Sequence, residues 1–368
     1  MDFLFTSEQE AIADLASQLF EFHTTDECIK KLADQKSTFD ADLWGQLSKT
    51  GLIALGLSTD HGGSGQGMLE LGLVLEKQGQ YLASAPLWQH IIASIAVEQF
   101  APSSLREQLL TDLARGDQVV AMACDVEACE SLVATNDGHL WKLSGKLHTI
   151  AIEKEHTHLL LLADSIKGRC CFLVPLHSKR LTRVDGFLTD HQPISDLTFD
   201  HVSVSHDHQI NLDIEQWLEP RIHLCISFLQ LGVIHESLKR TAAFSAERHQ
   251  FGKPIGSFQS LAVKAADAYI EVELLRSCAW QLAWRLDHQL PSVAAGRVAK
   301  FHAAKAGHIV GHTVQHIHGG IGTDLTYPIH RFFLKSQMLA LMGGGQENML
   351  SRIGQSLAHS EFESYIHE

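Results

Sequence analysis

The sequence lacks any apolar run of the roughly 18 residues that a membrane-spanning helix needs, and it is short of basic residues. Its 29 Lys and Arg are outnumbered by 43 Asp and Glu, which gives a net charge of −14. Such a charge disfavours a nucleic-acid backbone or an anionic membrane as the main partner. We therefore expect no nucleic acid and no membrane among its partners. The length of 368 residues, with a hydrophobic content of 45%, suits a globular protein with several packed layers.

Cysteine is scarce and has no regular spacing. There are 7 cysteines, an odd number without the pattern of a disulfide framework, which suits a reducing compartment. The segment Met1–Glu8 has no basic region and no cleavage site, so we expect a cytoplasmic protein. His308, His312 and His316 share one face of a predicted helix, but no carboxylate or cysteine ligand lies near them in the sequence. We therefore expect no metal site.

The hydrophobic periodicity changes twice along the chain, near residues 116 and 210. The 3.6-residue period predicts helices from Thr6 to Leu19 and over Asp40–Lys49, Met68–Ala83, Pro86–Phe100, Ser103–Ala114, Asp213–His249, Ser257–Leu290, Ser292–His318 and Gln346–His359. Short apolar or alternating runs predict strands over Val119–Cys124, Leu132–Thr135, His139–Leu143, His158–Ala163, Cys170–Pro175 and Ile194–Phe199. Asn136-Asp-Gly138 is a hairpin signal.

The sequence therefore predicts a mainly α protein with a central β domain. Residues 1–116 form an N-terminal helical domain, residues 117–210 a small antiparallel β domain, and residues 211–368 a C-terminal helical bundle. Gly63, Gly65 and Gly67 do not have the spacing of a dinucleotide-binding loop, and no βαβ unit surrounds them. They therefore do not indicate a nucleotide-binding loop.

The stretch Phe244–Gln259 carries the clearest functional motif. It reads Phe-Ser-Ala-Glu-Arg-His-Gln-Phe-Gly-Lys-Pro-Ile-Gly-Ser-Phe-Gln, and its glycines and Pro254 separate two predicted helices. Arg248, in the last turn of the first helix, can bind a phosphate through two N–H groups. Gln259, in the first turn of the second, carries an amide suited to an adenine edge or a ribose hydroxyl. Taken alone, the stretch also fits a plain helical corner whose Arg interacts with the helix dipole.

A second stretch argues against the alternative that Phe244–Gln259 is only a helical corner. Gln315-His-Ile-His-Gly-Gly-Ile-Gly322 is followed by Tyr327-Pro-Ile-His-Arg331. In order and spacing, the two stretches resemble the Arg-x-x-Phe-Gly-x-x-Ile…Phe-Gln and Gln-x-x-Gly-Gly-x-Gly signatures of the acyl-CoA dehydrogenase family of flavoproteins. The resemblance covers nearly the whole chain, and it implies the acyl-CoA dehydrogenase fold.

The resemblance also implies a reaction and a cofactor. Family members remove a proton from the α carbon of an acyl-CoA and pass a hydride from the β carbon to FAD, so we expect an FAD-dependent oxidoreductase of fatty acid or steroid catabolism. By the same resemblance Arg248 would contact the FAD pyrophosphate, with Gln250 and Phe251 beside it. The adenine and ribose would lie against Gln259, Gln315, Gly319 and Gly320. In this family a neighbouring subunit does much of this anchoring.

The catalytic base of the family is missing where the resemblance places it. The loop that usually holds this Glu reads Leu341-Met-Gly-Gly-Gly-Gln-Glu-Asn348, with Gly343 at the position of the Glu. Some members place the base on the first long C-terminal helix, which here falls near Ile222. Glu219 and Glu347 are the nearby substitutes. Both also fit structural roles, Glu219 as a solvated face residue and Glu347 as a first-turn acid favoured by the helix dipole.

The flavin-ring contacts of the family also look altered. Its Thr-Glu-Pro-x-Ala-Gly-Ser-Asp-like loop falls at residues 123–131, which contain no Pro and no Gly. Its Trp-Ile-Thr strand falls near Thr149-Ile-Ala151. The chain thus resembles a non-catalytic subunit of heteromeric, steroid side-chain type dehydrogenases, which would lend its half-site to the FAD of a related chain.

Three functions remain open from the sequence. The first is this subunit of a hetero-oligomer, such as an α2β2 assembly or tetramer, with acyl-CoA as substrate and an electron-transferring flavoprotein as acceptor. The second is a self-sufficient homo-oligomeric enzyme with a relocated base. The third is a binding protein without enzymatic activity on the same fold.

Overall fold

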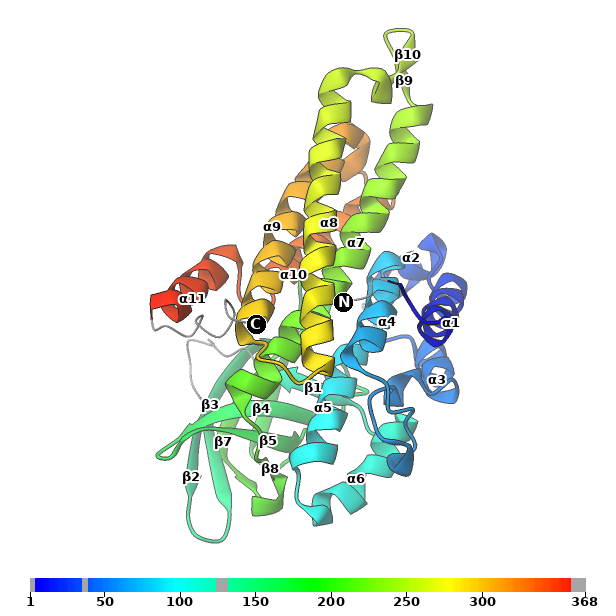
Figure 1. Ribbon diagram of the computed structural model, residues 1–368. Coiled ribbons are helices and arrows are strands. Elements are labelled where there is room, and N and C mark those ends of the chain that lie inside the picture. The colour runs from blue at the N-terminus through cyan, green and yellow to red at the C-terminus, as the bar shows by residue number, and fades with distance from the viewer. Residues whose placement is uncertain (1–3, 35–38, 124–131, 359–368) are drawn as a thin grey trace. The chain divides into compact units, whose positions relative to one another are not determined.

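The computed structural model describes residues 4–34, 39–123 and 132–358 (Figure 1). The chain divides into two compact units. The first comprises Met1–Asp26, Met68–Ala83 and Glu219–Glu368, and the second comprises Glu27–Gly67 and Ser84–Leu218. Among the described residues, no helix combines the length and apolar content needed to cross a bilayer.

The first unit consists of long helices. These are α1 (Ser7–His23), α4 (Met68–Gln80), α7 (Glu219–Glu247), α8 (Gln259–Asp287), α9 (Val293–His318), α10 (Ile329–Leu341) and α11 (Gln346–Ala358). α7, α8 and α9 run side by side (Figure 1). Leu224, Phe228 and Leu231 of α7 are fully buried, as their spacing along one helical face predicts. α1 begins with a capping box between Thr6 and Gln9.

α4 and α7 cross in direct backbone contact at two glycines. A Cβ on Gly232 would collide with the carbonyl oxygen of Glu76 and lie 2.7 Å from the amide nitrogen of Gln80. A Cβ on Gly79 would in turn collide with the carbonyl oxygen of Leu229. Because both neighbours are backbone atoms of a helix, neither can move aside without displacing the whole helix. The crossing fixes the position of α7.

We expect Gly232→Ala to destabilise the protein by about 1–3 kcal/mol, because the added methyl overpacks this crossing. Chemical denaturation measures the loss. The control is Gly354→Ala in α11, where a Cβ would meet nothing within 4 Å. There the same change should stabilise the helix by up to about 1 kcal/mol. Equal effects of the two substitutions would contradict the close approach.

The second unit combines short helices with a β-sheet. Its elements are α3 (Ala41–Lys49), α5 (Leu87–Phe100), α6 (Ser103–Arg115), β1 (Val120–Ala123), β2 (Val133–Asn136), β3 (Trp141–Ile150), β4 (His158–Ser165), β5 (Gly168–Pro175), β6 (Leu181–Phe187), β7 (Pro193–Val204) and β8 (Gln209–Ile210). In the described residues the strand order is β6-β7-β3-β2-β4-β5-β8, with β1 paired to β4. Leu143, Leu161, Phe172 and Val202 belong to the core against the sheet.

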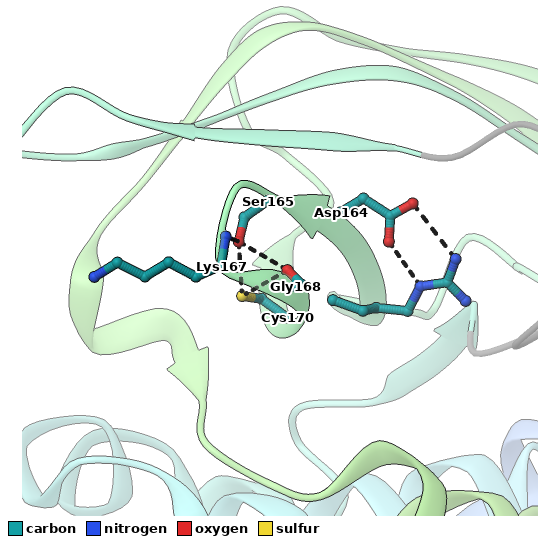
Figure 2. Close-up of polar contacts among 6 residues, drawn as sticks. Asp164, Ser165, Lys167, Gly168 and Cys170 are labelled. Atoms are coloured by element: carbon teal, nitrogen blue, oxygen red, sulfur yellow. Dashed lines mark hydrogen bonds and ion pairs between the residues drawn. The ribbon is translucent and has the colours of Figure 1, made fainter.

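The hairpin between β4 and β5 is closed by side chains at its turn (Figure 2). The Ser165 hydroxyl donates to the carbonyl of Gly168 at 2.8 Å and accepts from the Lys167 amide at 3.1 Å. Gly168 has a φ of +108°, a conformation that glycine adopts without strain. Arg169 and Asp164 form an ion pair at 2.8 Å across the strand ends. These contacts hold the register of the two strands.

The glycine loop at residues 57–67 uses its own backbone amides. Gly63 N donates to Ser58 O at 3.0 Å, Gly65 N to Leu57 O at 2.8 Å and Gln66 N to Leu55 O at 2.9 Å. A Cβ on Gly63 would collide with the carbonyl oxygens beneath it, so glycine is required for this fold-back. Amides that already bond to carbonyls do not cradle a phosphate, and the loop is a turn.

A half-buried carboxylate attaches this loop to α5. Glu98 Oε1 accepts from the Ser58 hydroxyl at 2.7 Å and lies 2.6 Å from His61 Nδ1. Partial burial raises the pKa of Glu98, but these hydrogen bonds outweigh it and place the pKa below the ordinary 4.5. The attachment therefore contributes stability above pH 4.5 that is lost as the pH falls through the lowered pKa.

We expect Glu98→Gln to cost about 1 kcal/mol at neutral pH, and we expect the cost to shrink as the pH falls below 4.5 through the lowered pKa. Thermal unfolding at a series of pH values from 7 downward measures the difference. Glu107→Gln on α6, whose side chain is exposed, is the control and should show a smaller change. A cost that stays constant over the whole pH range in which the protein folds would be inconsistent with this role for the Glu98 carboxylate.

The predicted fold class is confirmed, and several elements were missed, the two-residue strand β8 among them. α2 (Asp26–Asp34), α10 and β6 were not predicted. β6 is an edge strand with mostly exposed residues, so it lacks the apolar alternation on which the prediction depends. The sheet is mainly antiparallel, but β4 pairs in parallel with both β1 and β2, which the expectation of an antiparallel domain did not include. The division at residues 116 and 210 stays a prediction.

Candidate functional site

Ring stacking brings the two sequence motifs together in the first unit. The rings of Phe244, near the end of α7, and His318, at the end of α9, stack with centroids 4.4 Å apart and planes 19° apart. Tyr327 lies 5.6 Å from His318, measured between ring centroids. Burial lowers the pKa of His318, so the ring is neutral at pH 7 and stacks as an uncharged aromatic. The stack places the residues after Phe244 beside those after His318.

The Arg248 segment forms a small hairpin between α7 and α8 (Figure 1). α7 ends at Glu247, and the Ile255 amide donates to the Arg248 carbonyl at 2.8 Å. β9 (His249–Gln250) and β10 (Lys253–Pro254) make the two sides of the hairpin. Its tip residue Phe251 has a φ of +54° and is 91% exposed. Such an exposed aromatic side chain at a hairpin tip is suited to contact with another molecule.

The predicted FAD-binding side chains of this segment face solvent. Arg248, Gln250 and Gln259 are exposed. Gln259 is the first residue of α8, and the preceding Phe258 gives no side-chain cap. The first-turn amides of α8 and the Arg248 guanidinium therefore lie at the same end of the unit, which favours an anionic ligand there.

The glycines after α9 leave open space at the same end. Gly319 has a φ of +62°, and a Cβ on Gly319 or on Gly320 would meet nothing within 4 Å. A Cβ on Gly322, in contrast, would collide with the side-chain oxygen of Gln315. That oxygen is buried and has no hydrogen-bond partner among the described residues. The open glycine backbone and the exposed cation fit a diphosphate and its nucleoside, so these residues fit FAD.

The two positions at which the family resemblance places the base, Gly343 and Ile222, lie next to each other. A Cβ on Gly343 would lie 3.9 Å from Ile222 Cγ2 and 3.0 Å from Ile226 Cδ1. Ile222 is buried at 6% exposure. The position therefore holds a glycine and two isoleucines, and none of them can accept a proton.

Glu219 lies one turn before Ile222, and the expectation of a solvated residue there was wrong. Its side chain is 1% exposed. Oε1 accepts from Arg297 Nε at 3.0 Å, and Oε2 accepts from Arg352 Nη2 at 2.7 Å. Burial is possible because two guanidinium groups compensate the charge. A carboxylate whose two oxygens each accept from an arginine is a structural ion-pair partner rather than a group free to accept a proton from a substrate.

His223 lies between this ion-pair group and the glycine loop. Its Nδ1 is 3.9 Å from Glu219 Oε1. Burial, followed by the nearby charges of Lys300, Arg352 and Arg297, lowers the pKa of His223 well below 6.5. The ring is therefore neutral at pH 7. Glu347, the other substitute, is exposed in the first turn of α11, which is where its structural role places it.

Sequence reasoning missed His223, Arg297, Lys300 and Arg352. Arg297 and Lys300 belong to the inward face of α9, which they share with Ala303, Ala304 and Gly307, all of them buried. Charged residues at i and i+3 among small apolar residues on one helical face were the available signal.

The remaining predicted positions lie in the second unit, outside the described part or on α9. Thr149, in the segment compared with the flavin-ring strand, has a φ of +58°, and its amide donates to Asp196 at 2.9 Å. Residues 124–131, compared with the other ring-binding loop, lie outside the described residues. His308 and His312 contact each other with ring centroids 4.4 Å apart. In the described part of the chain, no three His, Cys, Asp or Glu side chains are grouped in a way that could hold a metal ion.

A unit of long helices and a unit with a β-sheet in one chain are the architecture of the acyl-CoA dehydrogenase class of flavoproteins. Comparisons with known families agree: the acyl-CoA dehydrogenase N-terminal domain matches residues 6–117, and the acyl-CoA dehydrogenase C-terminal domain matches residues 220–358. The chain belongs to the acyl-CoA dehydrogenase family. Its cofactor is accordingly FAD, and its class of activity is that of an oxidoreductase.

Individual relatives cover nearly the whole chain. The acyl-CoA dehydrogenase FadE27 of Mycobacterium tuberculosis is 31% identical over 98% of this chain and 100% of its own length. The ChsE4-ChsE5 complex from the same organism contains a chain that is 31% identical, with a TM-score of 0.93 over 97% of this chain and 99% of that one. A variant of the Tcur3481-Tcur3483 steroid ACAD is 32% identical, with a TM-score of 0.91 over 96% of this chain and 98% of that one.

Proposed function

We propose that this chain is a subunit of a heteromeric acyl-CoA dehydrogenase and contributes the adenine-diphosphate half of an FAD site to a catalytic partner chain. The observation that carries the proposal is the contrast between two parts of the first unit. The nucleotide end keeps an exposed Arg248 and open glycines, whereas the base position holds Gly343 and Ile222. The buried carboxylate one turn before Ile222, Glu219, is bound by two arginines.

The proposed partner is a related dehydrogenase chain that carries the base. The solved ChsE4-ChsE5 and Tcur3481-Tcur3483 assemblies each pair two chains, and the second is described as a steroid ACAD. We propose the same type of pairing here, with an acyl-CoA thioester of the steroid side-chain type as substrate. The proposed electron acceptor is an electron-transferring flavoprotein. No disulfide joins the described cysteines, and we propose a cytoplasmic location.

In this arrangement the residues of this chain bind and orient the cofactor. Arg248 donates charge-assisted hydrogen bonds to the pyrophosphate. Gly319 and Gly320 let the backbone approach the ribose and adenine closely, and Gln259 and Gln315 supply amides for the same groups. Bound FAD supplies the hydride acceptor for the oxidation of the acyl group. The partner chain supplies the carboxylate that removes the α proton.

The visible spectrum of the purified chain, alone and co-expressed with a related dehydrogenase chain, tests the proposal. We expect a colourless protein alone and a yellow complex whose flavin is bleached by an acyl-CoA substrate. A chain that is yellow and bleached by itself would instead indicate the self-sufficient enzyme with a relocated base. A chain that stays colourless in both preparations would indicate a binding protein.

A further inference from the structure

We infer that the Lys300 ammonium lies at the base position of this chain. A cation thus lies where a catalytic subunit carries the carboxylate that acts as the base. The inference rests on the proposed function in one respect, because that function identifies the region around Gly343 and Ile222 as the base position. The contacts themselves are observed within the first unit. Lys300 lies in the N-terminal half of α9 and is fully buried, with 0% exposure.

The Lys300 ammonium is bound to the backbone around Gly343. Nζ donates to the carbonyl of Ala340 at 2.9 Å and to the carbonyl of Gly344 at 2.7 Å. Ala340 lies in the last turn of α10, where carbonyls lack helical partners and favour a cation. Lys300 therefore joins the end of α10 to the glycine loop that follows it, and it acts as a positioning residue for that loop.

The same lysine faces the space into which a side chain at position 343 would point. A Cβ on Gly343 would lie 3.9 Å from Lys300 Cε, the same distance as from Ile222 Cγ2. A glutamate at position 343 would therefore place its carboxylate within reach of the ammonium. Gly343 has a φ of +68°, so any side chain there carries some backbone strain.

The other charged groups near position 343 do not offset the effect of the Lys300 ammonium on a carboxylate placed there. His223 of α7 is neutral because burial and the adjacent cations lower its pKa. Arg297 of α9 and Arg352 of α11 are cationic and already bind Glu219. A carboxylate introduced at position 343 would be stabilised in its charged form, which lowers its pKa, whereas a base for α-proton removal needs a pKa near neutral. Restoring the glutamate alone would give a poor base.

A double-mutant cycle on the full chain tests the inference. Gly343→Glu and Gly343→Gln are compared by chemical denaturation, each with Lys300 present and with Lys300→Met. At pH 7 we expect the Glu variant to have an unfolding constant roughly tenfold smaller than the Gln variant when Lys300 is present, because one pKa unit corresponds to a factor of ten. With Lys300→Met we expect the order to reverse. The same ratio in both backgrounds would overturn the inference.

The pH dependence provides a second measurement that does not need the Lys300→Met protein to fold. With Lys300 present, the carboxyl pKa in the Gly343→Glu variant is expected below its unfolded value. Its advantage over Gly343→Gln should then exist above the unfolded carboxyl pKa of about 4.3 and vanish as the pH falls through the lowered value. An advantage for Gln at pH 7 would contradict the inference. Both experiments measure unfolding of this chain without a partner or a flavin. A result against the Lys300 inference can therefore be distinguished from a result against the proposed function, which the flavin spectrum tests.

Discussion

Replacing Glu219 with Gln is expected to destabilise the protein by about 3–5 kcal/mol, because the change removes the charge that two buried cations share. Arg297 and Arg352 would stay at 6% and 14% side-chain exposure without their common carboxylate. Chemical denaturation of the purified chain measures the loss. A large loss of stability identifies Glu219 as a structural residue.

The matched control is Glu271→Gln. Glu271 pairs with one cation, Lys305, at 2.8 Å, and the lysine side chain is 32% exposed. Because this pair has one cation and reaches solvent, we expect a cost below about 1 kcal/mol. If Glu219→Gln left stability unchanged and abolished an activity of the chain alone, Glu219 would be the relocated base and the subunit role would be wrong.

Arg248→Ala is expected to release FAD from the complex formed with a related dehydrogenase chain. The substitution removes charge-assisted hydrogen bonds to the pyrophosphate, which contribute about 1.5–3 kcal/mol. This corresponds to roughly ten- to hundred-fold weaker binding. Because the Arg248 side chain is exposed, the fold should be unaffected. The ratio of flavin to protein absorbance after gel filtration measures retention.

Arg115→Ala serves as the control for this change. Arg115 is an exposed arginine in the last turn of α6, in the second unit, and it has no part in the proposed site. We expect its removal to leave the flavin content as it was. Full flavin retention by the Arg248→Ala complex would mean that this guanidinium does not bind the cofactor.

The sequence predicted the fold where helices are long and amphipathic or strands are apolar. α7, α8 and α9 were expected within a few residues of their ends, because Leu224, Phe228 and Leu231 repeat on one face. The nine residues of α2 are too few for such a repeat to stand out. The parallel pairing of β1 with β4 depends on contacts between strands distant in sequence, which a local pattern does not encode.

The candidate site was predictable where it consists of local motifs. Arg248 and Gly319 lie in two short signatures, and the Phe244–His318 stack brings those signatures together. The burial of Glu219 was not predictable in the same way. Its partners Arg297 and Arg352 come from α9 and α11, far along the chain, and an isolated acid at the start of a helix has the same local pattern whether solvent or arginine surrounds it.

The first unit is assembled from three separate stretches of the chain, Met1–Asp26, Met68–Ala83 and Glu219–Glu368. During synthesis, α1 and α4 leave the ribosome long before α7, against which α4 packs through Gly79 and Gly232. The face of α4 that packs against α7 stays without its partner until α7 has been translated. Production of the protein in a cell therefore depends on protection of this nascent helix from aggregation, and truncation of the chain before α7 would leave that face of α4 uncovered.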